Sequence, residues 1–517
     1  MTENRIAPLL WLALLAVAWT FYGLTGRDAW RTEEALALGA ILDWLQGAQA
    51  VWSEPAPLFT FAAGVLAAMT LGGLDVQDSA RLASALFSLV ALGCTGLAAR
   101  AYFGPGQGRS AVLALMGAMG LMLRAHALVP ETALLATWAL LIWGVTLGMR
   151  KTWPSVWLAA LALAILGLGM RGAPDLVAGL LVLLLPLALP EWRTAHYRRM
   201  VLLSIGLGAA MILLTLAWMG WTGDLAGWME WNRERLALPL REPWPVLADL
   251  GWFAWPLWPL GLAAVWHHHR RLRRALEVLF PLMALAVLLA VSVFPAWSRE
   301  GGLLPALVPL ALLAAHALEH MRRGAAQAFY WFGVLCFSFF AIVFWLYFSA
   351  LEWGAPVRMA AHLHRLLPAY QAGSVEGWRI GVAAVVTLLW LVAIPLFPRA
   401  RIRPILVWAT GMGLTWVCVI SLFRPWIETG FAYRPLILEV ARHLPAGACL
   451  ATDTDPAMAV MVRYHLDNPA TAGCSWTLRR VDPDARMEGQ EGVQVLWEGR
   501  RPRLKRERYR LEHRVQG

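Results

Sequence analysis

The sequence predicts an all-α polytopic membrane protein of about thirteen transmembrane helices, followed by a small extracytoplasmic α/β domain. The first observation is composition: 59% of the 517 residues are hydrophobic and 15% are charged, whereas soluble domains carry about 25% charged residues. The second is a series of apolar stretches near the ~20 residues that cross a bilayer. The third is a rise in charge from about residue 424, after which no apolar stretch follows. Together they exclude an ordinary soluble protein.

Arginine and lysine are concentrated in alternate connections between the apolar stretches, as expected for cytoplasmic loops. The other connections hold most of the acidic residues and are predicted to face outside. This pattern predicts a bacterial inner-membrane protein with a cytoplasmic N-terminus, and it explains the net charge of +11 without nucleic acid as a partner. The predicted spans are 7–24, 81–100, 109–126, 131–149, 154–170, 174–190, 200–220, 249–266, 275–295, 302–319, 327–350, 378–397 and 404–422.

Residues 57–74 are also apolar but are left out of this count. Counting them as a span would move the basic clusters at 267–271 and 399–403 to the outside, against the charge rule. The prolines before this stretch and Gly72-Gly73 after it are typical of a segment that lies along the membrane or dips into it. The alternative is a fourteenth span.

The first apolar stretch allows two interpretations. A short start bearing Arg5 before an apolar run is typical of a secretory signal. The run continues to Leu24 without a polar break, which favours a retained first helix.

Residues 424–517 are predicted to form a periplasmic α/β domain beyond the membrane part at 1–423. Its pattern indicates helices at 434–444 and 455–466 and strands at 448–451, 493–497 and 509–512. Cys449 and Cys474 both fall in this domain, so a disulfide between them is one of two open alternatives in an oxidising compartment. The chain carries no paired Cys-x-x-Cys motif and no zinc signature.

The first outer loop, within residues 25–80, contains the most closely spaced candidate functional residues. Glu33 and Glu34 occupy the first turn of a predicted amphipathic helix that continues to about Leu45, where the helix dipole favours carboxylates. One interpretation is a capped surface helix. The other is a carboxylate held at the membrane face to accept a proton from a hydroxyl group.

The outer segment 221–248 mixes arginine with tryptophan, which suits an interfacial helix that contacts membrane lipid. The cluster His267-His268-His269 is explained as part of a cytoplasmic basic loop, so no metal is predicted there.

Several short motifs, in order along the chain, resemble the GT-C glycosyltransferases, most closely the group of protein O-mannosyltransferases and lipid A aminoarabinose transferases. The first is an Arg-Asp-x-Trp sequence followed two residues later by an acidic pair and Ala. Others are similar to the family's Glu-Lys-Pro-Pro-Leu, Ala-Arg-Leu-Pro-Ser-Ala-Leu, Thr-Pro-Asp, Thr-Lys-Gly and Tyr-Leu-Leu-Pro elements. The matching segments here are 27–35, 53–58, 79–86, 129–131, 170–172 and 299–305.

This chain departs from the family pattern at three positions. Both of the family's aspartates are glutamates here, Glu33 and Glu131, and each side chain is one methylene longer. A shift of that size at a catalytic base costs rate. The family lysine that contacts the donor phosphate is replaced by Pro55, so other cations must neutralise that phosphate.

The resemblance implies a transferase that moves a sugar from a polyprenyl-phosphate donor to a lipid, glycan or protein acceptor outside the cytoplasm. It implies Glu33 as the base on the acceptor hydroxyl, with single displacement and inversion, and Glu131 as a group that positions the acceptor or assists the base. Arg171 takes the place of a family lysine and is expected, with Arg299, to bind the phosphate. Asp28, Glu34 and Glu54 are further expected binding residues.

No cofactor and no metal are expected, because the chain offers no clear acidic ligand triad. Two other classes stay open: an inactive scaffold that binds lipid-linked sugar, and a lipid or solute transporter. A transporter predicts ionisable residues near mid-span and internal repeats.

Overall fold

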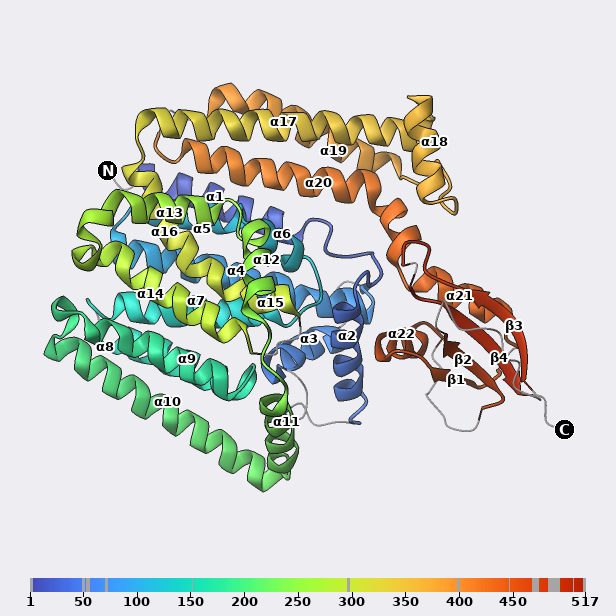
Figure 1. Ribbon diagram of the computed structural model, residues 1–517, viewed down its shortest axis with the longest axis horizontal. Helices are drawn as coiled ribbons and strands as arrows, with labels where there is room; N and C mark the ends of the chain where they lie inside the picture. Colours follow the sequence, from blue (N-terminus) through green and yellow to red (C-terminus); the bar gives the residue numbers. More distant parts are fainter. Residues whose placement is uncertain are drawn as a thin grey trace. The chain divides into compact units, whose positions relative to one another are not determined.

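The computed structural model describes residues 3–48, 52, 56–69, 73–150, 152–294, 298–397, 400–445, 447–466, 474–481, 493–504 and 506–514. Figure 1 labels the helices and strands in chain order. The fold is mostly helical, with one small sheet near the C-terminus, as the sequence predicts.

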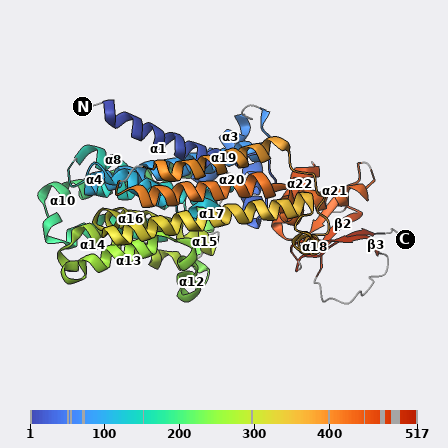
Figure 2. The same ribbon diagram turned by 90° about the horizontal axis from the view of Figure 1, so that it is seen from above.

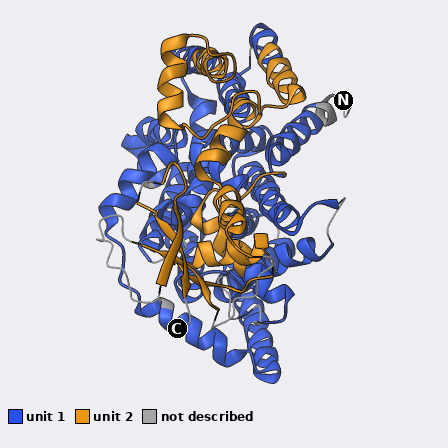
Figure 3. Ribbon diagram, turned by 90° about the vertical axis from the view of Figure 1, so that its right-hand side faces the viewer, with its two compact units in different colours: residues 1–25, 40–338, 389–416 blue, residues 26–39, 339–388, 417–517 orange. Residues whose placement is uncertain are grey.

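The chain divides into two compact units, which Figure 3 colours separately. Unit 1 comprises residues 1–25, 40–338 and 389–416, and unit 2 comprises residues 26–39, 339–388 and 417–517. The predicted domain boundary at 423/424 lies inside a helix that ends at Phe431. Four helices continue from one unit into the other: α2 (Thr32–Leu45), α17 (Arg323–Trp353), α19 (Gly377–Leu396) and α20 (Arg403–Phe431).

Seven helices in the described part of the chain are long and apolar enough to cross a membrane. The chain is therefore a multi-pass membrane protein, while the number thirteen stays a prediction. Helices α13 (Leu257–His268) and α14 (Leu276–Ser292) add a bent pair that passes the same test together. The seven are α4 (Val76–Phe103), α8 with the π-helical η3 (Thr152–Gly169), α10 (Ala195–Thr222), the run from α15 to α16 (Arg299–His320), α17, α19 and α20.

Shorter helices complete the described chain. The helix α3 has 13 residues within the predicted interfacial stretch at 57–74, fewer than a span needs. Together with α3 (Pro57–Met69), the shorter helices are α1 (Glu3–Phe21), α5 (Gln107–Met116), α6 (Met119–Ala125), α7 (Glu131–Leu147), α9 (Ala173–Leu184), η4 (Leu185–Ala188), η5 (Pro190–Trp192), α11 (Leu225–Ala237), α12 (Pro243–Phe253), η6 (His269–Arg274) and α18 (Val357–Leu366).

Two predicted spans are interrupted. The stretch 109–126 breaks between α5 and α6, where the Trp408 indole donates a hydrogen bond to the Gly117 carbonyl at 2.9 Å. That carbonyl is thereby engaged by a side chain. The stretch 249–266 breaks between α12 and α13 beside Pro256, whose ring nitrogen has no hydrogen to donate to a helix.

The core of unit 1 is built on α4, α7 and α16. Helix α4 packs against α3, α5 and α7, and α7 in turn packs against α8. Helix α16 lies beside α13 and α14, as Figure 2 also shows. In the most apolar 18-residue segment of the α15–α16 run, 100% of the residues are buried. In the corresponding segment of α10, 22% are buried. Helix α16 is thus an inner helix, and α10 presents most of its surface to lipid.

The C-terminal part of unit 2 carries a mixed four-stranded sheet in the order β1-β2-β4-β3. Strand β1 pairs with β2 in parallel, and β4 pairs with both β2 and β3 in antiparallel register. The predicted strands and helices are confirmed within a few residues, and β2 was not predicted. The elements are α21 (Arg434–Arg442), β1 (Leu450–Asp453), α22 (Pro456–Leu466), β2 (Trp476–Arg480), β3 (Val493–Gly499) and β4 (Tyr509–Arg514).

Cys449 and Cys474 form a disulfide with their Cα atoms 5.3 Å apart. It joins the residue before β1 to a residue shortly before β2, so the parallel strand pair is covalently linked. Cys94, Cys336 and Cys418 are free thiols.

We therefore expect alkylation of the denatured, unreduced protein to modify three cysteines, and alkylation after reduction to modify five. Intact mass spectrometry counts the adducts. The double variant Cys449→Ser/Cys474→Ser is the control, because it should give three adducts in both states. Five adducts on unreduced wild-type protein would show that the pair is not bonded.

Candidate active site

The first outer loop is held by a buried ion pair within unit 2. Both nitrogens at the end of the Arg27 guanidinium donate to the Glu34 carboxylate, at 3.1 and 2.7 Å. The Trp30 backbone N–H adds a third bond to Glu34 at 3.0 Å, and Arg27 stacks over the Trp30 ring. Both oxygens of Glu34 accept hydrogen bonds and the residue is 1% exposed. In this arrangement Glu34 shapes the loop.

Asp28 connects the same loop to the C-terminal part of unit 2. Its carboxylate accepts the backbone N–H groups of Tyr433 and Arg434, each at 2.8 Å, where α21 begins. The His465 ring lies 3.2 Å from the other oxygen. Burial alone would raise the pKa of Asp28, but the hydrogen bond and charge of His465 and the backbone donors outweigh it. The net pKa is lowered. Asp28 therefore acts as a cap for α21.

Glu33 differs from its neighbour in exposure. It lies in the first turn of α2 and is half-buried, whereas Glu34 points into the loop. Of the acidic pair, Glu33 is the residue with surface that a substrate can reach. Glu54, the other acid expected in this loop, and Pro55 lie outside the described residues.

A second polar cluster forms in unit 1 around Arg124 of α6. One terminal nitrogen of Arg124 donates to Glu300 at 2.8 Å and to the Ser298 hydroxyl at 3.0 Å, and the other lies 3.7 Å from Glu131. Ser298 also donates to Glu131 at 3.1 Å. Glu131 begins α7 and is fully buried, while the Glu300 side chain is 29% exposed. The cluster thus fixes Glu131 and leaves Glu300 partly accessible.

The close packing around Arg124 depends on the backbone of α15 (Arg299–Leu303). Ser298 caps α15 by accepting the Gly301 N–H at 2.9 Å. A Cβ atom at Gly301 would collide with the Glu131 carboxylate. A glycine is therefore needed where α15 passes the start of α7.

Arg171 lies at the break between η3 and α9. Its guanidinium forms a two-bond pair with Asp175, at 2.5 and 2.8 Å, and the Trp138 indole donates to the same carboxylate at 3.3 Å. Arg171 is 3% exposed and Asp175 is fully buried. Gly172 follows at a φ of 80°, a conformation that glycine adopts without strain. This turn directs the Arg171 side chain toward Asp175 in the first turn of α9.

Two more arginines stand near Arg171 in unit 1. Arg299 pairs with Asp249 at 2.5 Å and its side chain is 51% exposed. Burial lowers the pKa of Arg241, and the charges of Arg171 and Arg299 lower it further. Arg171 and Arg299 therefore both lie close enough to Arg241 to repel its charge. We call Arg171, Arg241 and Arg299 the arginine cluster.

The expected site residues fall into both units. Glu33, Glu34 and Asp28 belong to unit 2, and Glu131, Arg171 and Arg299 to unit 1. Within unit 1, the neighbouring residues Arg299 and Glu300 link the arginine cluster to the Arg124 cluster. Among the described residues, no group of three His, Cys, Asp or Glu side chains is arranged to hold a metal ion.

The sequence patterns do not single out Arg124 or Asp175, and they place Arg241 only within the lipid-contacting segment 221–248. Arg124 lies within a predicted apolar span, and a charge inside such a stretch is itself a signal of function. Asp175 follows Arg171 by four residues, the spacing of an ion pair along a helix. His126, five residues before Glu131, stacks on Trp416 with ring centroids 4.0 Å apart, so it contributes to packing.

The contacts of Asp28 predict a pH-dependent loss of stability in the variant Asp28→Asn. A lowered folded pKa contributes stability that is present above the unfolded pKa of about 3.9 and is lost as pH falls through the folded value. We expect the variant to lower the free energy of unfolding at pH 7 by about 1–2 kcal/mol, the size of a cap. The deficit should shrink below about pH 4.

Denaturant unfolding of the full chain in detergent at several pH values measures this difference. The control is Asp453→Asn, whose side chain is 67% exposed in the same unit and should change little. A deficit that stays constant down to pH 2 would contradict the assignment.

Comparison with known proteins gives a structural match. No family model and no curated protein sequence matches this chain. ArnT from Cupriavidus metallidurans, solved bound to undecaprenyl phosphate, is 15% identical, with a TM-score of 0.66 over 98% of both chains. The apo structure of the same protein gives 14% identity and a TM-score of 0.67, again over 98% of both chains. The chain therefore has the fold of ArnT, and the resemblance inferred from its motifs is confirmed at the level of the fold.

Proposed function

We propose that this chain is a membrane glycosyltransferase that moves a sugar from a polyprenyl-phosphate donor to an acceptor hydroxyl outside the cytoplasm. The observation that carries the proposal is the match to ArnT along 98% of both chains, because ArnT was solved with undecaprenyl phosphate bound. The ordered motifs in the sequence support the same reaction. The acceptor is a lipid, a glycan or a protein hydroxyl.

Glu33 is the proposed base. A single displacement needs a carboxylate that removes the proton of the acceptor hydroxyl as that oxygen attacks the sugar's anomeric carbon. Glu34 is engaged by Arg27 and Trp30, whereas Glu33 is half-buried in the first turn of α2. Breaking the bond from the anomeric carbon to the phosphate oxygen on the opposite face then inverts the configuration.

The arginine cluster is the proposed site of the leaving phosphate. Negative charge grows on the phosphate as its bond to the sugar breaks, and guanidinium groups stabilise that charge. Arg171 is fixed by Asp175, and Arg299 retains 51% of its side-chain surface. These cations supply the charge that the resemblance assigns to the lysine replaced by Pro55.

The Arg124 cluster is the proposed binding site for the acceptor. Glu131 is buried and held by Ser298, so it orients neighbouring groups. Glu300 keeps exposed surface and can accept a hydrogen bond from the acceptor. We place the N-terminus in the cytoplasm and residues 424–517 in the periplasm of a bacterial inner membrane, as the loop charges favour.

The role of Glu33 predicts that Glu33→Gln loses transfer while it still binds donor. A general base contributes about 10²–10⁴-fold to rate, so we expect kcat to fall by that range. Transfer from radiolabelled undecaprenyl-phosphate sugars to a crude membrane acceptor fraction, with purified protein in lipid, measures the activity. Retention of the labelled donor on the protein measures binding.

The control for this experiment is Glu230→Gln, because that acid is 52% exposed and pairs with Arg233 on its own helix α11. Equal rates for wild type and Glu33→Gln would exclude Glu33 as the base. If the wild-type protein binds donor but transfers none of the sugars tried, the result would favour the alternative of an inactive scaffold that binds lipid-linked sugar.

The arginine cluster predicts a different kinetic change. Arg299→Gln removes a charge-assisted contact to phosphate, which is worth about 1.5–3 kcal/mol. We expect the KM for donor to rise about tenfold or more. Arg233→Gln is the matched control, since that arginine is 78% exposed on α11. An unchanged KM for donor in Arg299→Gln would remove Arg299 from the phosphate site.

A further inference from the structure

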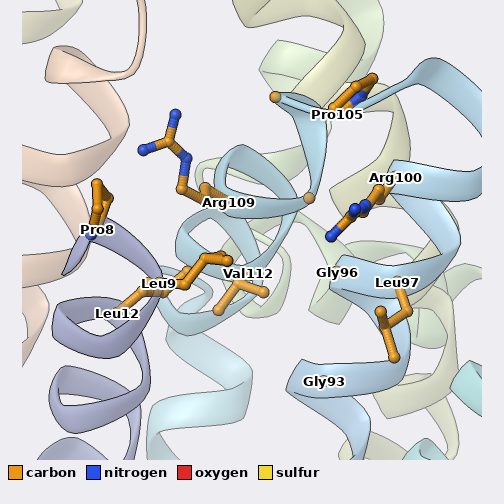
Figure 4. A pocket seen from close by; sticks show the side chains of 12 residues that line it. Pro8, Leu9, Leu12, Gly93, Gly96, Leu97, Arg100, Pro105, Arg109 and Val112 are labelled. Carbon is orange, nitrogen blue, oxygen red and sulfur yellow. The ribbon is translucent and has the colours of Figure 1, made fainter. Parts of the chain in front are cut away.

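A pocket of about 610 Å³ lies between α1, α4 and α5 in unit 1. Figure 4 shows that its side chains are divided by character. Leu9, Leu12, Leu97 and Val112 line one end, and Arg100 and Arg109 stand at the other, beside the α4–α5 turn. The volume falls in the range of small-molecule sites. None of these residues belongs to the proposed active site.

Glycines create the space. A Cβ atom at Gly108 would meet the Gly96 carbonyl oxygen at 2.6 Å, so α4 and α5 approach closely only because these residues are glycines. Gly93, one turn before Gly96, also lines the pocket, and a Cβ atom there would meet nothing within 4 Å. Helices α4 and α5 are thus in close contact at Gly96, whereas the pocket has open space beside Gly93.

The basic end can hold an anion. Arg100 lies in the last turn of α4, and Arg109 lies in the first turn of α5. Within the described chain, neither guanidinium forms an ion pair with a carboxylate. Helix α5 begins after Gly106, which has no side chain to cap the first N–H groups. Two guanidiniums and an uncapped helix start therefore meet at one end of an apolar pocket.

We propose that this pocket binds an anionic glycerophospholipid, with the phosphate at Arg100 and Arg109 and an acyl chain along the leucines. Basic pockets between transmembrane helices bind such headgroups. Leu9 is 50% exposed and Leu97 is 41% exposed, so the apolar part opens toward the surface that lipid covers. A free phosphate would make no contact with that apolar part of the pocket. The site is separate from the donor and acceptor sites proposed above.

Native mass spectrometry of the full chain in detergent tests the proposal, with phosphatidylglycerol as the probe and phosphatidylcholine as the neutral comparison. We expect wild type to retain phosphatidylglycerol with about tenfold higher affinity, the size of one charge-assisted contact. Arg100→Gln/Arg109→Gln should abolish this preference. Gly93→Leu should fill the pocket and weaken binding of both lipids.

Matched controls separate the pocket from general charge and packing effects. Arg198→Gln/Arg199→Gln removes two exposed arginines at the start of α10, and Gly206→Leu adds a side chain at an open position on the same helix. Both should bind like wild type. Melting temperatures without lipid verify that all variants are folded.

Four results would each overturn the proposal. They are unchanged preference in the arginine double variant, unchanged binding in Gly93→Leu, full displacement of the lipid by inorganic phosphate, and displacement by undecaprenyl phosphate at lower concentration than by phosphatidylglycerol. The third result would indicate a simple anion site. The fourth would indicate a site for the donor lipid.

Discussion

Buried arginines set the position of the polar groups in this protein. A guanidinium keeps its proton at any relevant pH, so an arginine taken out of water needs an acid beside it. In the described chain, every buried arginine has such a partner. Arg27 pairs with Glu34, Arg81 with Asp78, Arg124 with Glu300 and Glu131, Arg171 with Asp175, and Arg501 with Glu507.

These pairs decide which acids are available for chemistry. Glu34 and Asp175 look like candidates by residue type, but their oxygens are engaged by arginine. Asp28 is engaged by the backbone of α21. Glu33 keeps partly exposed surface next to the buried Glu34, and Glu300 keeps 29% of its side-chain surface exposed while it pairs with Arg124. The buried arginines therefore fix the segments that carry these two acids.

The sequence predicts the local features of this fold and not the contacts between distant segments. Apolar length and loop charge locate most helices, because a span must satisfy its own backbone in lipid. The break at Gly117 was not predicted, because it depends on Trp408, 291 residues away. Strand β2 is not among the predicted strands, although apolar and polar residues alternate from Cys474 to Arg479. Asp28 was expected to bind substrate, and nothing local indicates that it caps α21.

Under the proposed function, the arginine cluster supplies the positive charge that the resemblance assigns to a lysine at the position of Pro55. Arg171 and Arg299 each repel the charge of Arg241, and burial adds to the cost of holding Arg241 charged. An anion that enters among them relieves both effects, since it offsets the repulsion and supplies acceptors in place of water. Asp175 and Asp249 each hold one member in place. Under the proposed function, these two fixed arginines and Arg241 bind the leaving phosphate together. That role requires the phosphate to lie near the start of α9 and the start of α15.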